Sequence, residues 1–121
     1  MAGEAIEGLI AEGESFRDVD WASISESEFR DCTFVACDFS ETLIRNVRLV
    51  GATFRECDVS LFKPTDCSIG GSQFEDCRML GVDWTLANWP RVPLHNPNAF
   101  IRCDLSLGTF TDLMLGAVRF E

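Results

Sequence analysis

The chain has 121 residues, of which 46% are hydrophobic, and a formal net charge of −10. This length predicts one domain over residues 1–121. No run approaches the ~18 apolar residues of a membrane span, and residues 1–15 lack the basic and apolar regions of a secretion signal, so we expect a cytoplasmic protein without a membrane partner. Nucleic acid is an unfavourable direct partner, because phosphate binding requires a basic surface.

The N-terminal segment is the acidic part of the chain. Residues 1–31 hold nine acidic and two basic side chains, whereas residues 32–121 hold eleven and eight. Residues 1–21 are expected to cap the domain, with a helix over about Gly3–Glu12, since one helical face would gather Ala5, Ile6, Leu9 and Ile10. A frayed acidic tail is the alternative.

Residues 22–89 repeat with a period of five. Every fifth residue from Ile24 to Trp89 is large and apolar except at Pro64, and the residue two positions earlier is usually small. This period fits neither a helix nor a strand, and it predicts short units that each turn a corner, so that the chain coils. The expected core includes Phe29, Phe34, Phe39, Phe54, Phe74, Trp84 and Trp89.

A slower period of twenty residues is superimposed on the first. It relates Phe34 to Phe54 and Phe74, and Cys37 to Cys57 and Cys77. Four units in each turn would stack the phenylalanines on one side and the cysteines on the next. We therefore expect the cysteines to be reduced core residues rather than disulfide or metal ligands, in particular Cys32, Cys37, Cys57, Cys77 and Cys103.

The repeat is interrupted once. Pro90, Pro93 and Pro97 mark residues 90–98 as a loop or irregular corner, and the rhythm resumes over 99–121 with Phe100, shifted by one residue. The nineteen units predict about five coils and a rod of ~24 Å. At the C-terminal end three arrangements stay open, namely a homodimer through that end, a docked partner, or a longer natural chain.

The units resemble the pentapeptide-repeat pattern, as in Ser27–Asp31, Cys32–Ala36, Cys37–Glu41 and Ala52–Glu56. The resemblance implies an all-β, right-handed quadrilateral β-helix and a non-enzymatic protein. The best understood members of that family confer quinolone resistance by binding type II topoisomerases such as DNA gyrase. Some of them mimic duplex DNA, and they are commonly dimers joined at their C-terminal ends.

No residue pattern predicts a catalytic, cofactor or metal site. The single histidine, His95, lies in the proline-rich loop without a nucleophile beside it in the sequence, and each expected side of the coil mixes acidic and basic residues, which does not favour DNA mimicry. We expect a protein-interaction solenoid that binds a topoisomerase; the alternative is a scaffold for an unrelated partner. The candidate contacts are Arg91, Leu94, His95 and Asn96 in the loop, which otherwise is a tolerated insertion, and Glu12, Glu14, Asp18 and Asp20 at the acidic end.

Overall fold

The computed structural model describes residues 4–40, 42–61, 63–86, 98–108 and 119–120. These residues form thirteen short strands and one 3-10 helix, with no α-helix among them. Within these ranges no helix has the length and apolar character needed to cross a membrane. The elements are β1 (Glu4–Glu7), β2 (Ile10–Glu12), β3 (Ser15–Arg17), β4 (Trp21–Ser25), β5 (Glu28–Arg30), β6 (Thr33–Val35), β7 (Leu43–Arg45), β8 (Arg48–Val50), β9 (Thr53–Arg55), β10 (Ser68–Gly70), β11 (Gln73–Glu75), η1 (Trp84–Leu86), β12 (Ala99–Ile101) and β13 (Arg119–Phe120).

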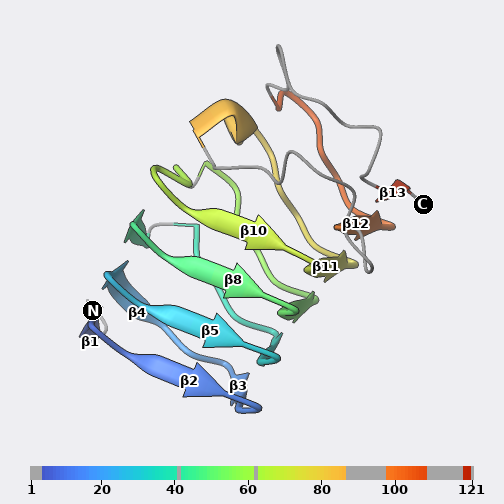
Figure 1. Ribbon diagram of the computed structural model, residues 1–121. Coiled ribbons are helices and arrows are strands. Elements are labelled where there is room, and N and C mark those ends of the chain that lie inside the picture. Colours follow the sequence, from blue (N-terminus) through green and yellow to red (C-terminus); the bar gives the residue numbers. More distant parts are fainter. Residues whose placement is uncertain (1–3, 41, 62, 87–97, 109–118, 121) are drawn as a thin grey trace.

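The chain coils so that each strand pairs in parallel with the strand one turn away (Figure 1). The first side of the coil holds β1, β4 and β7, the second β2, β5, β8 and β10, and the third β3, β6, β9, β11, β12 and β13. The fourth side is joined by isolated bridges from Asp38 to Asp58, Arg78 and Asp104 in turn. The predicted all-β, four-sided solenoid is therefore confirmed.

Each strand ends at a corner residue with a positive φ. In one regular layer these residues are Glu26, Asp31 and Ala36, with φ values of 53°, 54° and 55°. Glycine adopts this left-handed conformation freely, and aspartate and asparagine adopt it more readily than other residues. The corner after β10 is Gly71, whose φ is 62°, whereas Gly70 ends that strand.

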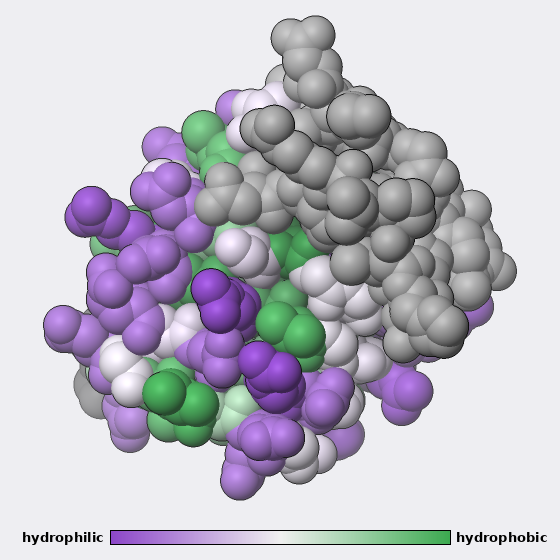
Figure 2. All heavy atoms as spheres, viewed as in Figure 1, coloured by the Kyte–Doolittle hydropathy of each residue, from purple (hydrophilic) through white to green (hydrophobic). Residues whose placement is uncertain are grey.

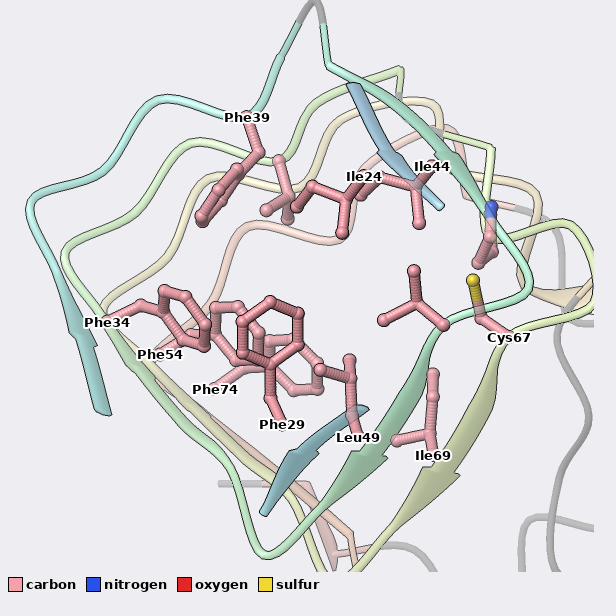
Figure 3. A pocket seen from close by; sticks show the side chains of 13 residues that line it. Ile24, Phe29, Phe34, Phe39, Ile44, Leu49, Phe54, Cys67, Ile69 and Phe74 are labelled. Carbon is pink, nitrogen blue, oxygen red and sulfur yellow. The ribbon is translucent and has the colours of Figure 1, made fainter. Parts of the chain in front are cut away.

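Stacked phenylalanine rings form the third side of the core. Phe54 lies between Phe34 and Phe74, with ring centroids 4.8 and 4.9 Å away, and the stack extends to Phe16 and Phe100. Figure 3 shows the rings of Phe34, Phe54 and Phe74 lying one over another inside the coil. The twenty-residue period thus predicted this register correctly. The predicted core residues Phe29, Phe34, Phe39, Phe54, Phe74 and Trp84 are all buried, and Trp89 lies outside the described residues.

The cysteine ladder is also present at its predicted position. The thiols of Cys57, Cys77 and Cys103 each donate to a phenylalanine carbonyl of the layer before, over 3.4, 3.3 and 3.1 Å. All six cysteines are free, and five of them are buried, whereas Cys103 is partly exposed. A small cysteine side chain therefore packs at the corner of the coil beside each of these stacked phenylalanine rings.

The predicted helix at the N-terminus is wrong. Residues 4–12 form β1 and β2, which pair with β4 and β5 and add one layer below the predicted coils. Gly8 and Gly13 have φ values of 69° and 67°, so the chain turns after each short strand instead of continuing as a helix. The first turn is two residues shorter than the regular turns of twenty residues, because Ile6 pairs with Ile24 across eighteen residues.

Two irregularities interrupt the layers above. The centre of the first side carries Pro64, which is buried but lacks a backbone N–H. Among the described residues, the sheet on this side ends at β7, which is followed by an isolated Arg45–Thr65 bridge. On the third side, Phe74 pairs with Phe100 across twenty-six residues. Asn98 fixes the returning chain, since its side chain accepts from the Ser72 N–H and donates to the Ile69 carbonyl.

Candidate interaction surface

Among the described residues, the interior of the coil is filled by side chains. Side chains from all four sides converge there (Figure 3), and the cavity that remains between them measures about 30 Å³ and has an entirely apolar lining. This volume suits about one water molecule. A ligand larger than water does not fit this cavity, so the candidate contacts lie on the outer surface, which Figure 2 shows to be mainly hydrophilic over the second side.

The predicted acidic contacts are exposed on the first layer. Glu12 lies in β2, Asp18 is the corner after β3, and Glu14 and Asp20 lie in the adjoining connections. They are distributed along successive sides of this layer and do not converge on one pocket. Arg17 lies 3.9 Å from Asp18, but both side chains are more than two-thirds exposed, so this ion pair contributes little. The loop candidates Arg91, Leu94, His95 and Asn96 lie outside the described residues.

Ion pairs between adjacent layers were not predicted from the sequence. Arg48 lies 3.4 Å from Glu28, and Arg55 lies 3.3 Å from Glu75. The sequence contained a signal for these ion pairs, because the two residues of each pair are separated by the twenty residues of one turn. These contacts neutralise part of the second and third sides.

The corner of the third side carries a stronger contact across the insertion. Arg102 donates from Nε and Nη2 to the two carboxylate oxygens of Asp76, over 2.7 and 3.1 Å. This bidentate bond holds the pKa of Asp76 below its ordinary value. Sequence reasoning missed the pair because the insertion lengthens its separation to twenty-six residues.

Carboxylates on the fourth side are hydrogen-bonded within their own unit. Asp38 accepts from the backbone N–H and the hydroxyl of Ser40, and Asp104 accepts in the same way from Ser106. The bonds from the serine hydroxyls lower the pKa of both carboxyls. The sequence contains a signal for these hydrogen bonds that was missed, namely the Asp-x-Ser motif that recurs on this side.

The cysteine thiols do not form a metal site within the part of the chain that the structure describes, where no group of three or more ligating side chains is placed to hold an ion. Burial raises the pKa of Cys37 and of Cys67. Cys103 differs because the neighbouring Cys77 thiol lowers its pKa to about 7.

A protein-family model describes the regular part of the coil. The model for a pentapeptide repeat region matches residues 27–99, which is more than half of the chain. No curated protein sequence matched the chain.

Solved structures similar to this chain include QnrB1, a plasmid-mediated fluoroquinolone resistance protein, in a trypsin-treated form. It is 22% identical over 89% of this chain and 58% of its own, with a TM-score of 0.44. A pentapeptide repeat protein from the Arabidopsis thaliana thylakoid lumen is 18% identical over 92% of this chain and 68% of its own, with a TM-score of 0.46. This chain thus spans less than two-thirds of that trypsin-treated QnrB1 chain. Because both TM-scores are below 0.5, the assignment rests on the family model together with the observed five-residue corners: the chain belongs to the pentapeptide repeat family.

Proposed function

We propose that the protein is a non-catalytic interaction solenoid of a bacterial-type cytoplasm whose partner is a type II topoisomerase such as DNA gyrase. The observation that carries the proposal is the acidic first layer, where Glu12, Glu14 and Asp18 are exposed. A topoisomerase binds duplex DNA and so presents basic surface to the phosphates. An acidic end on a regular rod has the complementary charge, which favours encounter and orientation.

The absence of catalysis belongs to the same proposal. The apolar cavity of about 30 Å³ leaves no enclosed space for a substrate, and Asp38 and Asp104 are hydrogen-bonded to serines of their own units. These features support a binding role over a catalytic one. Imitation of DNA along the whole rod is not included, because Arg48 and Arg55 neutralise carboxylates on the second and third sides.

The test is a DNA gyrase supercoiling assay with micromolar protein. We expect inhibition by the chain as it stands and a loss of about tenfold in potency when Glu12, Glu14, Asp18 and Asp20 are changed together to their amides. A matched control changes Glu56, Asp58, Asp66 and Asp104, which lie beyond the second layer, and should leave the potency within about twofold. All of these substitutions are at exposed or half-exposed positions.

Unchanged supercoiling and unchanged quinolone-dependent DNA cleavage would exclude the topoisomerase as the partner. The general interaction scaffold, which needs only the filled coil and its charged surface, is then the function to pursue. The predicted homodimer through the C-terminal end stays a prediction, and solution mass measured against protein concentration will decide it.

A further inference from the structure

The first side of the coil carries a surface hollow. It lies over β4 and β7, has a volume of about 430 Å³, and extends to the Arg45–Thr65 bridge. Its described lining includes Ser23, Ser25, Leu43, Arg45, Leu61 and Lys63.

The register of the strands explains the hollow. Ser23 pairs with Leu43 and Ser25 with Arg45, so two short side chains lie directly beneath two long ones. Pro64 then interrupts the sheet above. Leu61, a corner residue with a φ of 63°, projects at the far edge, and a Cβ atom at Gly81 would approach within 2.9 Å of its side chain. The serines therefore form the floor, and the longer side chains form the walls.

The charge of the hollow is opposite to that of the protein as a whole. Arg45 and Lys63 form no ion pair with any described residue, in contrast to Arg48, Arg55 and Arg102, which each pair with a carboxylate. No aspartate or glutamate is found in the described lining. Two cations without a carboxylate partner among the described residues, in a chain of net charge −10, favour an anionic ligand at this place.

The walls also carry exposed apolar surface. Leu43 is 76% exposed and Leu61 is 70% exposed, and they are two of the five large hydrophobic side chains that the described residues leave exposed. Both line the hollow. A ligand that matches it must therefore combine negative charge with an apolar side chain.

We propose that this hollow binds an acidic segment of a partner protein, with carboxylates paired to Arg45 and Lys63 and an apolar side chain packed on Leu43 and Leu61. The inference rests on the proposed interaction function and names the contact surface, but it does not require the partner to be a topoisomerase. Nucleic acid fits less well, because only two cations line the hollow and the apolar walls offer nothing to a phosphate backbone.

The probe is a fluorescein-labelled synthetic peptide of alternating glutamate and leucine, whose binding is followed by fluorescence anisotropy at low salt. We expect the double variant Arg45→Ser/Lys63→Ser to weaken binding by at least about tenfold. Arg78→Ser is the matched control, since it removes an exposed cation without a salt bridge from the fourth side, and it should change the affinity less than about twofold. Leu43→Ser should weaken binding by about fivefold.

Two further probes complete the test. A peptide with serine in place of leucine should bind at least about fivefold more weakly, and a labelled single-stranded oligonucleotide should bind no better than that serine peptide. Equal losses in Arg78→Ser and the double variant, or preferential binding of the oligonucleotide, would overturn the inference. The gyrase assay and the peptide assay test the two proposals separately. Peptide binding without gyrase inhibition would refute only the topoisomerase as the partner. Gyrase inhibition without peptide binding would refute only the hollow as the binding site.

Discussion

The first and third sides of the coil share one sequence period but end differently. The third side stacks six strands in register over a column of phenylalanine rings, whereas the sheet on the first side ends after β7. The difference follows from the residue at the centre of one unit, where Pro64 stands on the first side and Phe54 and Phe74 stand on the third. A five-residue pattern therefore fixes the coil, while a proline at one centre of the first side prevents a further strand from pairing there.

The largest effect is expected in the ring column of the third side. Phe54→Ala removes a ring that is stacked on both faces and should lower the free energy of unfolding by about 3–5 kcal/mol. Ile44→Ala on the first side removes a half-buried side chain and should cost less, about 2 kcal/mol. Urea denaturation of the two variants measures this difference, and equal losses would contradict the contrast between the two sides.

Thiol reactivity should differ between the cysteines that lie next to the third side and to the first side of the coil. Cys103, beside the third side, is partly exposed and its pKa is lowered to about 7, whereas Cys67, beside Pro64, is buried and its pKa is raised. The thiolate is the reactive form, so at pH 7.5 iodoacetamide should modify Cys103 at least about tenfold faster than Cys67. Peptide mass spectrometry over time gives both rates, and Cys103→Ser should remove the fast phase. Comparable rates would indicate that the layer at Pro64 opens readily.

The corners permit a finer comparison. Ala36, after the third side, has a φ of 55°, which is unfavourable for alanine, so Ala36→Gly should raise the free energy of unfolding by about 1 kcal/mol. Asn46, after the first side, has a φ of 54° but donates from its side chain to Glu26 over 2.9 Å. Asn46→Gly should therefore give no gain. Thermal unfolding of both variants tests this, and destabilisation by Ala36→Gly would contradict the role assigned to the corners.

The smallest effect on stability is expected on the fourth side of the coil, which connects the third side of one layer to the first side of the next. Hydrogen bonds from Ser40 lower the pKa of Asp38 in the folded protein, so the stabilisation is present above the ordinary carboxyl pKa and is lost as the pH falls through the lowered value. Ser40→Ala should cost up to about 0.5 kcal/mol at pH 7, because Asp38 is largely solvated. The two proteins should have equal stability near pH 2. A difference that persists in acid would point to a packing effect of the serine instead.

The sequence predicted the core better than the surface. Equivalent centres twenty residues apart were sufficient to place Phe54 over Phe34, and Cys57 over Cys37. The helix expected near Ile6 failed because Ile6 and Leu9, three residues apart, fit one face of a helix and also the inward positions of the coil. Ile10, which completed the helical face, is instead exposed, and the chain turns at Gly8.

The candidate sites were harder to predict. Exposure of Glu12 and Asp18 followed from their polarity, but the ion pair between Arg55 and Glu75 required the assumption that partners lie one turn apart. The hollow beside Leu43 depends on how far each side chain projects from adjacent layers, and a sequence pattern does not carry that information.

The constant register of the coil has a consequence for engineering. Thr33, Thr53 and Gln73 occupy equivalent positions in successive layers, so duplicating residues 34–53 would insert one complete layer in register. The contacts of the two copies with the layers outside them exist in the parent, whereas the contact between the copies is new. Such an insertion would move the acidic first layer away from Arg102 by one strand spacing, about 4.8 Å. The distance between two binding surfaces on this rod is thus adjustable in whole steps, which makes the protein a molecular ruler.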